Sequence, residues 1–385
     1  MKSAEFPSTI ILGSTGSVGE QAIDVAKQHG IAVRALSARK NWQRVAEQAR
    51  ELLPSAVAMS DEASASSLRL ALADTPIRVY GGEAGLIEMI EKTEAEFAVN
   101  AVLGEAGLAP SLAVLRSGKH LALANKESLV VAGDIVMAEA KARGLRITPV
   151  DSEHCAIDQC LRSGAHGEIK KLILTASGGP FFGKKRTDLT HITVDETLAH
   201  PTWKMGAKIT VDSATLMNKG FEVIEAAHLF DLEASKIDVV VHRESIIHSM
   251  VEYIDNSVIA QMSVPDMRLC VQYALTSPRR TAAVIPSLDL VKVSKLTFAE
   301  PDGETFPLLP QAKRMLALGG AAPAALNAAN EIAVDAFLKH RISLLSLFDI
   351  VLRVTEDMPH AACAHTLSQI LDIDREARER ALALI

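Results

Sequence analysis

The start of the chain decides its fold: residues 8–19 read Ser8-Thr-Ile-Ile-Leu-Gly13-Ser-Thr-Gly16-Ser-Val-Gly19. A short apolar run leads into a glycine-rich turn, and an amphipathic helical pattern follows it. Glycines at such a turn let the backbone approach a pyrophosphate, and the helix N-terminus favours the negative charge. The spacing, G-x-x-G-x-x-G, is a variant of the dinucleotide-binding fingerprint. A lone glycine pattern fits any tight turn, but the strand before it and the helix after it indicate a nucleotide site.

Strand-like and helix-like segments alternate through the first 150 residues. Short apolar runs recur at residues 31–38, 56–59, 77–80, 98–103 and 120–124, with helical patterns between them. Repeated strand–helix units predict a parallel sheet with helices on both faces. We therefore expect an α/β chain in which residues 1–150 form a doubly wound, Rossmann-like domain.

The loop after the second predicted strand indicates which dinucleotide binds. Arg39, Lys40 and Asn41 follow that strand, at a place where an NAD site commonly carries an acidic residue for the ribose 2′-hydroxyl. Two cations suit the 2′-phosphate of NADP instead. A solvated basic loop would have the same composition, so the preference for NADP depends on the dinucleotide fold around it.

A polar group, Asn125-Lys126-Glu127-Ser128, follows the predicted strand at 120–124. Polar residues at the carboxyl end of a parallel strand lie where such folds bind their ligands, so we expect ligand contacts here. The same residues could instead initiate a helix without touching a ligand.

Two acidic clusters further along the chain indicate a metal site. Asp151 and Glu153 stand two residues apart after an apolar run, so an extended chain would place both on one side. If the second cluster is helical, Asn218, Lys219 and Glu222 share one side, which makes Glu222 a candidate third ligand. Carboxylate oxygens bind hard divalent cations. Solvated acidic residues at strand ends are the plainer alternative.

Three further segments have the character of a substrate site. Ser177 precedes Gly-Gly-Pro, and its hydroxyl and the neighbouring amides could hold a phosphate, although the segment could also be a plain turn. Residues 200–206 form a Pro- and Gly-bounded loop that carries Trp203, as in a lid that excludes water; a Trp packed in the core is the alternative. Ser213 is predicted to cap the helix of the second acidic cluster and expose its amides.

The remaining segments complete a multidomain chain. Residues 248–254 and 258–264 predict a β-hairpin, and Ala- and Leu-rich helical patterns dominate from residue 308. We expect an α+β catalytic domain at 151–285 with a flap at about 198–207. A linker at 286–310 and a C-terminal helical bundle at 311–385 would follow.

Composition excludes some classes of function. The net charge of −7 argues against a nucleic-acid surface, and no apolar run approaches the roughly 20 residues of a membrane span. Residues 1–8 are too short and polar for a signal peptide, and the four cysteines show no zinc-finger spacing. We therefore expect reduced, mostly buried thiols and a cytoplasmic protein.

Taken together, six motifs make the chain resemble the 1-deoxy-D-xylulose 5-phosphate reductoisomerase family over essentially its whole length. They lie at residues 13–19, 123–128, 149–154, 175–181, 200–206 and 212–222. Their order is highly specific. The chain departs from the family pattern at Arg39, where the family often has glycine.

The resemblance implies a homodimeric enzyme with an NADPH domain, a catalytic domain with a mobile flap and a C-terminal helical domain. It implies conversion of 1-deoxy-D-xylulose 5-phosphate to 2-C-methyl-D-erythritol 4-phosphate, a step of non-mevalonate isoprenoid synthesis. It also implies a divalent cation, Mg or Mn.

Roles for individual residues follow from the same resemblance. The metal ligands would be Asp151, Glu153 and Glu222. The substrate phosphate would be held by Ser177, Ser213, Asn218 and Lys219. The sugar and its reacting atoms would be contacted by Lys126, Ser152, Glu153, His200 and Glu222, with Trp203 and Met205 on the flap. The NADPH contacts would be Gly13, Thr15, Gly16, Ser17, Val18, Arg39, Lys40, Asn41, Asn125, Glu127 and Gly206.

Two other functions remain compatible with the motifs taken singly. One is an NADP-dependent reductase similar to aspartate-semialdehyde or homoserine dehydrogenase, which would not need Glu222 as a metal ligand. The other is a non-catalytic NADPH sensor, in which Asp151 and Glu153 would simply be solvated. The combination of three carboxylates with a phosphate-type cluster counts against both.

Overall fold

The computed structural model describes residues 6–203 and 205–385. Over this part of the chain, two compact units are formed from interleaved segments. Unit 1 comprises Met1–Ser128, Val136–Cys155 and Asp266–Pro286. Unit 2 comprises Leu129–Ile135, Ala156–Pro265 and Ser287–Ile385.

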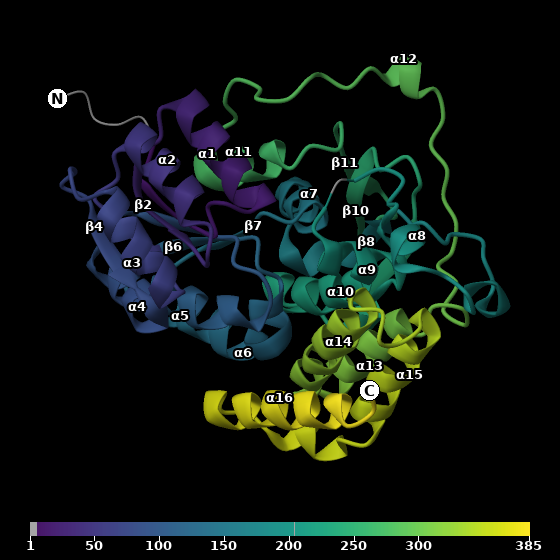
Figure 1. The fold of residues 1–385 in the computed structure, drawn as a ribbon. Coiled ribbons are helices and arrows are strands. Elements are labelled where there is room, and N and C mark those ends of the chain that lie inside the picture. Colours follow the sequence, from purple (N-terminus) through teal and green to yellow (C-terminus); the bar gives the residue numbers. More distant parts are fainter. Residues whose placement is uncertain (1–5, 204) are drawn as a thin grey trace. The chain divides into compact units, whose positions relative to one another are not determined.

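Unit 1 is built on a parallel sheet of strand order β4-β3-β2-β1-β5-β6-β7 (Figure 1). Its strands are β1 Thr9–Leu12, β2 Val33–Ala38, β3 Ala56–Met59, β4 Arg78–Gly81, β5 Phe97–Asn100, β6 His120–Leu123 and β7 Ile147–Pro149. Ile11 on β1 pairs with Leu36 on β2 and with Val99 on β5. The sheet therefore grows from β1 in one direction through β2 to β4, and in the opposite direction through β5 to β7. In such sheets the ligand binds beside this reversal, at the carboxyl ends of the strands. The predicted doubly wound sheet is confirmed.

Helices follow the strands of unit 1 in regular alternation. They are α1 Ser17–His29, α2 Trp42–Leu52, α3 Glu62–Ala71, α4 Gly82–Lys92, α5 Leu108–Arg116, α6 Glu127–Ala142 and α7 Ser152–Cys160. A later helix, α11 Arg268–Thr276, returns from far along the chain and packs against α1. Its Val271 and Leu275 join the same apolar core as Ile11 of β1. Sequence position alone did not predict this return.

Unit 2 contains a second sheet, of strand order β11-β10-β8-β9. Its strands are β8 Ile169–Ala176, β9 Ile237–Val241, β10 Ile247–Tyr253 and β11 Val258–Met262. The antiparallel pair β10–β11 confirms the predicted hairpin, and its turn is closed where Asp255 accepts hydrogen bonds from Ser257. Helices α8 Val194–Leu198, α9 Ala207–Ala214, α10 Met217–Phe230 and α12 Leu290–Val293 belong to the same unit.

The last part of unit 2 is entirely helical, as its Ala- and Leu-rich pattern predicts. It comprises α13 Leu308–Leu318, α14 Ala322–Leu338, α15 Leu344–Glu356 and α16 Leu367–Leu382. Helix α14 packs against both α15 and α16 and is buried along most of its length. The division into four segments at residues 150, 285 and 310 stays a prediction. None of the helices described for residues 6–203 and 205–385 is long and apolar enough to cross a membrane.

Candidate active site

The glycine turn between β1 and α1 has the geometry that a dinucleotide phosphate needs. Gly13 has φ of +78°, and a Cβ there would lie 2.5 Å from the carbonyl oxygen of Ala101. A Cβ on Gly19 would lie 2.2 Å from the carbonyl oxygen of Gly13. Within the described residues, no side chain caps the first turn of α1, where Gly16 is the N-cap. Open amides at a helix N-terminus can therefore meet an anion.

The remaining predicted contacts of this turn lie at its surface. Gly16 and Ser17 are exposed, whereas Thr15 and Val18 are half-buried. The outer side of the turn thus offers backbone amides and the hydroxyls of Thr15 and Ser17 to a ligand. Its inner side packs against the rest of the chain. The residues fit the diphosphate of a dinucleotide.

The basic loop after β2 is exposed and faces an acidic residue that the sequence analysis did not single out. Arg39 and Lys40 are exposed, and the Asn41 side chain caps α2 by accepting a hydrogen bond from the backbone amide of Arg44. Hydrogen bonds from Ser64 lower the pKa of Asp61, and the nearby charges of Lys40 and Arg39 lower it further. The loop therefore has cations available for a 2′-phosphate beside an ionised carboxylate.

Asn125 is buried at the carboxyl end of β6 and organises the start of α6. Its Nδ2 donates to the carbonyl oxygens of Val102 and Gly104 at 2.7 and 2.8 Å, and to Glu127 at 3.2 Å. Its Oδ1 accepts from the backbone amide of Ser128 at 2.9 Å. Asn125 therefore does help to start α6, and a contact of Asn125 or Glu127 with a cofactor stays a prediction.

Asp151 and Glu153 do not lie on an extended strand, which corrects that part of the prediction, but their carboxylates still come together, with oxygens within 4.8 Å of each other. Strand β7 ends at Pro149 and α7 begins at Ser152, so Ser152 and Glu153 lie in the first turn of a helix. The reason is local capping: the backbone carbonyl of Asp151 accepts from the amide of Cys155 at 2.9 Å, and its Oδ1 accepts from the amide of Glu153 at 3.3 Å. Asp151 is thus fixed by the helix that it introduces.

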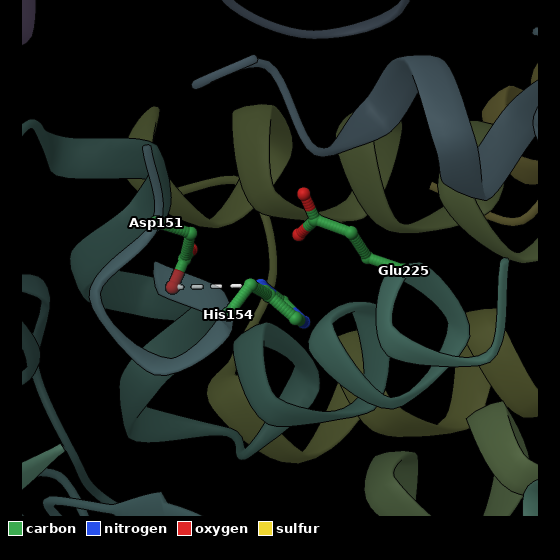
Figure 2. A group of neighbouring side chains, drawn as sticks. All are labelled: Asp151, His154 and Glu225. Carbon is green, nitrogen blue, oxygen red and sulfur yellow. Dashed lines mark ion pairs between the residues drawn. The ribbon is translucent and has the colours of Figure 1, made fainter. Parts of the chain in front are cut away.

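The Asp151 carboxylate forms a nearly buried ion pair with Lys126. Lys126 Nζ lies 2.6 Å from Asp151 Oδ2, with side-chain exposures of 8% and 12%. His154 Nδ1 lies 3.8 Å from Asp151 Oδ1, the pair joined by the dashed line in Figure 2. Burial opposes ionisation of Asp151, but the charges of Lys126 and His154 outweigh it and lower the pKa of this carboxyl. Asp151 is therefore an anion at neutral pH, the form that binds a cation.

Glu222 is the corresponding carboxylate of unit 2, and the predicted helix around it is confirmed. On α10, Lys219 forms an ion pair with Glu222 Oε2, and Asn218 Nδ2 donates to Glu222 Oε1 at 2.5 Å. The side chains of Lys219 and Glu222 are only 4% and 1% exposed. Glu225, also drawn in Figure 2, lies one turn further on the same helix and is fully buried. The sequence analysis missed it, because its spacing alone does not distinguish it from a surface acid.

Ser213 does not cap α10, which corrects the prediction. It lies inside α9, which runs from Ala207 to Ala214, and the residue before α10 is Leu216 with φ of +59°. The left-handed Leu216 separates two helices where the sequence analysis expected one. Ser213 is nevertheless half-buried on the side of α9 that meets the Gly178-Gly179 turn: a Cβ on Gly179 would lie 2.8 Å from the Ser213 carbonyl oxygen.

Ser177 and His200 meet at the carboxyl end of β8. His200 Nε2 lies 3.0 Å from Ser177 Oγ, and His200 Nδ1 accepts from the amides of Thr202 and Trp203 at 3.2 and 3.0 Å. Because Nδ1 is an acceptor, the proton of the neutral ring is on Nε2 and is donated to Ser177. Burial lowers the pKa of His200, and the charge of Arg243 lowers it further. Ser177 Oγ can then direct its own hydrogen to an anion.

Arg243 supports this corner and was not identified from the sequence. Its Nη1 donates to the carbonyl oxygen of Gly179 at 2.7 Å and to that of Ser177 at 3.3 Å. It thereby fixes the Gly-Gly turn while leaving a positive charge near Ser177 and His200. No local signal predicts this, because the contact joins segments 64 residues apart.

The predicted flap begins where α8 ends and finishes where α9 begins. Trp203 and Met205 are half-buried, and the Trp203 ring lies 6.4 Å from the ring of His248 on β10. Gly206 is exposed and is the N-cap of α9. Lys204, within the predicted flap, lies outside the described residues. Movement of this segment stays a prediction.

Comparisons with known proteins match almost the whole chain. A family model described as 1-deoxy-D-xylulose 5-phosphate reductoisomerase matches residues 9–133. Two models of C-terminal domains of the same enzyme family match residues 147–230 and 262–380.

Individual relatives match end to end. The 1-deoxy-D-xylulose 5-phosphate reductoisomerase of Caldanaerobacter subterraneus subsp. tengcongensis is 50% identical, over 96% of this chain and 97% of the relative. A solved structure of the Zymomonas mobilis enzyme in complex with NADPH is 39% identical, with a TM-score of 0.91 over 98% of this chain and 99% of that one. A reductoisomerase structure in complex with NADPH, fosmidomycin and magnesium is 38% identical, with a TM-score of 0.90 over 98% of both chains.

Proposed function

The chain belongs to the 1-deoxy-D-xylulose 5-phosphate reductoisomerase family, and from this premise we propose which of its residues bind the metal, the substrate and NADPH. The protein is an NADPH- and divalent-metal-dependent oxidoreductase that converts 1-deoxy-D-xylulose 5-phosphate to 2-C-methyl-D-erythritol 4-phosphate, a step in making isoprenoid precursors. This membership replaces the two alternatives of a simple NADP-dependent reductase and an NADPH sensor. The assignments to individual residues are the proposal.

We propose that Asp151, Glu153 and Glu222 bind the divalent cation. The observation that carries this assignment is the chemistry of the donor set: each residue offers a carboxylate oxygen, as hard cations such as Mg and Mn prefer. Asp151 is kept ionised by its surroundings, as its lowered pKa indicates. Lys126 and Lys219 each offset one of these buried negative charges.

The substrate phosphate is assigned to Ser177, Ser213, Asn218 and Lys219. Ser177 has a hydroxyl hydrogen to donate, because its oxygen already accepts from His200 and from the Gly179 amide at 3.3 Å. Lys219 supplies the positive charge. Binding energy from a phosphate that does not react can hold the reacting end of the sugar in place. Lys126, Ser152 and His200 are assigned to the sugar, with Trp203 and Met205 above it.

NADPH is assigned to the glycine turn and the basic loop. The diphosphate would meet the amides at residues 15–18, and the 2′-phosphate would meet Arg39, Lys40 and Asn41. Gly13 keeps the turn packed against Ala101, because a Cβ there would lie 2.5 Å from the Ala101 carbonyl oxygen. Asn125, Glu127 and Gly206 are proposed to contact NADPH as well.

The cation and NADPH contribute one part of the chemistry, and residues of the chain contribute another. When bound, the cation supplies Lewis acidity and a template for neighbouring sugar oxygens, and NADPH supplies the hydride. Lys126 and His200 carry N–H donors that can hold sugar oxygens, and the charge on Lys126 favours a developing negative charge nearby. Closure of the proposed flap, at about 198–207, over the sugar would exclude water during the reduction.

We further propose a cytoplasmic homodimer, as the family resemblance implies. β11 is the outer strand of its sheet, and Val258 on it is 47% exposed, which leaves an edge open to another chain. Light scattering during gel filtration checks this directly. A molar mass near twice 41.2 kDa supports the dimer, whereas a mass near 41.2 kDa refutes it.

The residue assignments are tested by NADPH oxidation with 1-deoxy-D-xylulose 5-phosphate, with Mg or Mn and again with EDTA. We expect oxidation that requires the metal and is lost in Glu222→Gln, because a neutral amide is a weaker ligand for a hard cation. Asp238→Asn, which removes a half-exposed carboxylate from β9 of the same unit, is the matched control and should keep its activity. Metal-dependent turnover that survives in Glu222→Gln would remove Glu222 from the ligand set.

A further inference from the structure

Behind the glycine turn lies a chain of polar side chains that no cofactor contact explains. It runs from Ser14 in the turn, through Gln48 on α2 and Glu20 on α1, to Arg44 at the start of α2. We propose that Gln48 and Arg44 are positioning residues that hold the glycine turn and the basic loop at the separation that NADPH spans. The inference rests on the proposed assignment of NADPH to those two segments.

The first link ties the turn to α2 through two reciprocal hydrogen bonds. Ser14 Oγ donates to Gln48 Oε1 at 2.7 Å, and Gln48 Nε2 donates back to the carbonyl oxygen of Ser14 at 3.0 Å. Ser14 is fully buried and Gln48 is 1% exposed. A paired buried amide is costly to leave unsatisfied, so this link fixes both partners firmly. Ser14 itself points into the protein and is not available to a cofactor.

The second link ties α1 to α2 near the expected diphosphate. Glu20 lies in the first turn of α1, where its charge alone would oppose a bound diphosphate. Arg44 donates to both of its oxygens, at 2.7 and 2.9 Å, and Gln48 Nε2 donates to Oε1 at 2.9 Å. The carboxylate is therefore compensated and turned toward α2. The hydrogen bond from Arg44 is the largest cause of the lowered pKa of Glu20.

The same Arg44 is joined to the basic loop. Its backbone amide donates to the side chain of Asn41, which directly follows Arg39 and Lys40. Every step from the glycine turn to the basic loop is thus a hydrogen bond of 3.2 Å or less. Two anion-binding segments held at a fixed spacing lose less entropy when one ligand occupies both. The network therefore strengthens the binding of NADPH, which occupies both segments at once.

The test is Gln48→Met, which keeps side-chain bulk but removes both bonds to Ser14. Dissociation constants are measured for NADPH, for NADH, which lacks the 2′-phosphate, and for 2′-AMP, which lacks the diphosphate. We expect about a tenfold rise in Kd for NADPH, a smaller rise for NADH and no change for 2′-AMP, because three ordering hydrogen bonds are lost, two with Ser14 and one with Glu20. Ser14→Ala removes one bond and should give the same pattern in weaker form.

The control is Glu47→Gln on the same helix. Glu47 also pairs with Arg44, but its side chain is 65% exposed and it does not bond to the turn. Its Kd values should match those of the wild type. Thermal unfolding of each variant establishes that binding is compared between folded proteins.

Two results overturn the inference, and they are distinguishable. If an Arg39→Ser/Lys40→Ser variant keeps the wild-type preference for NADPH over NADH, the basic loop is not the 2′-phosphate site and the inference fails with that assignment. If this variant loses the preference but Gln48→Met raises the Kd of NADPH and NADH equally, or of neither, the cofactor assignment stands and the network does not couple the two segments.

Discussion

Each unit contains a buried lysine–carboxylate pair, and the two pairs are built in different ways. In unit 2, Lys219 and Glu222 stand three residues apart on one helix and are 4% and 1% exposed. In unit 1, Lys126 and Asp151 come from two different loops, 25 residues apart, and are 8% and 12% exposed. The first pair is determined by helix periodicity, whereas the second exists only because β6 and β7 are neighbours in the sheet.

The difference shows how each carboxylate is kept in place. Glu222 is bonded by Lys219 and Asn218 of its own helix turn. Asp151 is bonded by Lys126 from outside and by the amide of Glu153 from its own helix. Replacing the lysine should therefore lower the free energy of unfolding by different amounts in the two pairs. The loss depends on how buried the carboxylate is and on the hydrogen bonds that it keeps.

The largest effect is expected for Lys219→Met. Glu222 loses its ion-pair partner while almost fully buried, and breaking a buried pair costs roughly 3–5 kcal/mol of the free energy of unfolding. Urea unfolding of the metal-free protein measures this. In the control, Lys219→Met combined with Glu222→Gln should recover most of the loss. A wild-type urea midpoint for Lys219→Met alone would contradict the expectation.

A smaller loss, roughly 1–3 kcal/mol, is expected for Lys126→Met. Each carboxylate keeps one hydrogen bond when its lysine is replaced, Asp151 from the Glu153 amide and Glu222 from Asn218, but Asp151 is more exposed than Glu222. The same urea experiment applies, with Lys126→Met combined with Asp151→Asn as the matched control. If Lys126→Met costs more than Lys219→Met, burial is not what distinguishes the two pairs.

The pH dependence of stability gives a further test in unit 2, through His248. Burial, with added contributions from the charges of His242 and Lys219, lowers the pKa of His248 from 6.5 to about 4. The unfolded chain therefore takes up a proton near pH 6.5 that the folded chain resists. Stability should be fully present above pH 6.5 and should fall by about 3 kcal/mol as the pH drops to about 4.

Urea midpoints measured across this pH range check the size of the effect. The slope should be shallower in His248→Gln, which cannot take up the proton. It should also be slightly shallower in Lys219→Met, since the charge of that lysine contributes to the lowered pKa. An unchanged slope in His248→Gln would assign the pH dependence to other groups.

Much of the fold and several site residues could be predicted because their signals are local. Gly13 has a left-handed φ and Gly19 meets Gly13 within the same turn, and Asn218, Lys219 and Glu222 share a face because of helix periodicity. The predictions that were wrong also concerned local geometry, but at the points where helices begin and end. The left-handed Leu216 removed Ser213 from the helix that it was expected to cap, and capping by Asp151 placed Glu153 on a helix.

The sequence by itself therefore determined the order of strands and helices, the family and the identity of the candidate site residues, since these depend on residue type and short spacing. Only the tertiary structure decided which distant groups meet. It brought Lys126 to Asp151, Arg243 to the Ser177 turn and Gln48 to Ser14. Such contacts depend on which strands and helices become neighbours. That is settled by burial of the whole apolar core, and it leaves no trace in any short stretch of sequence.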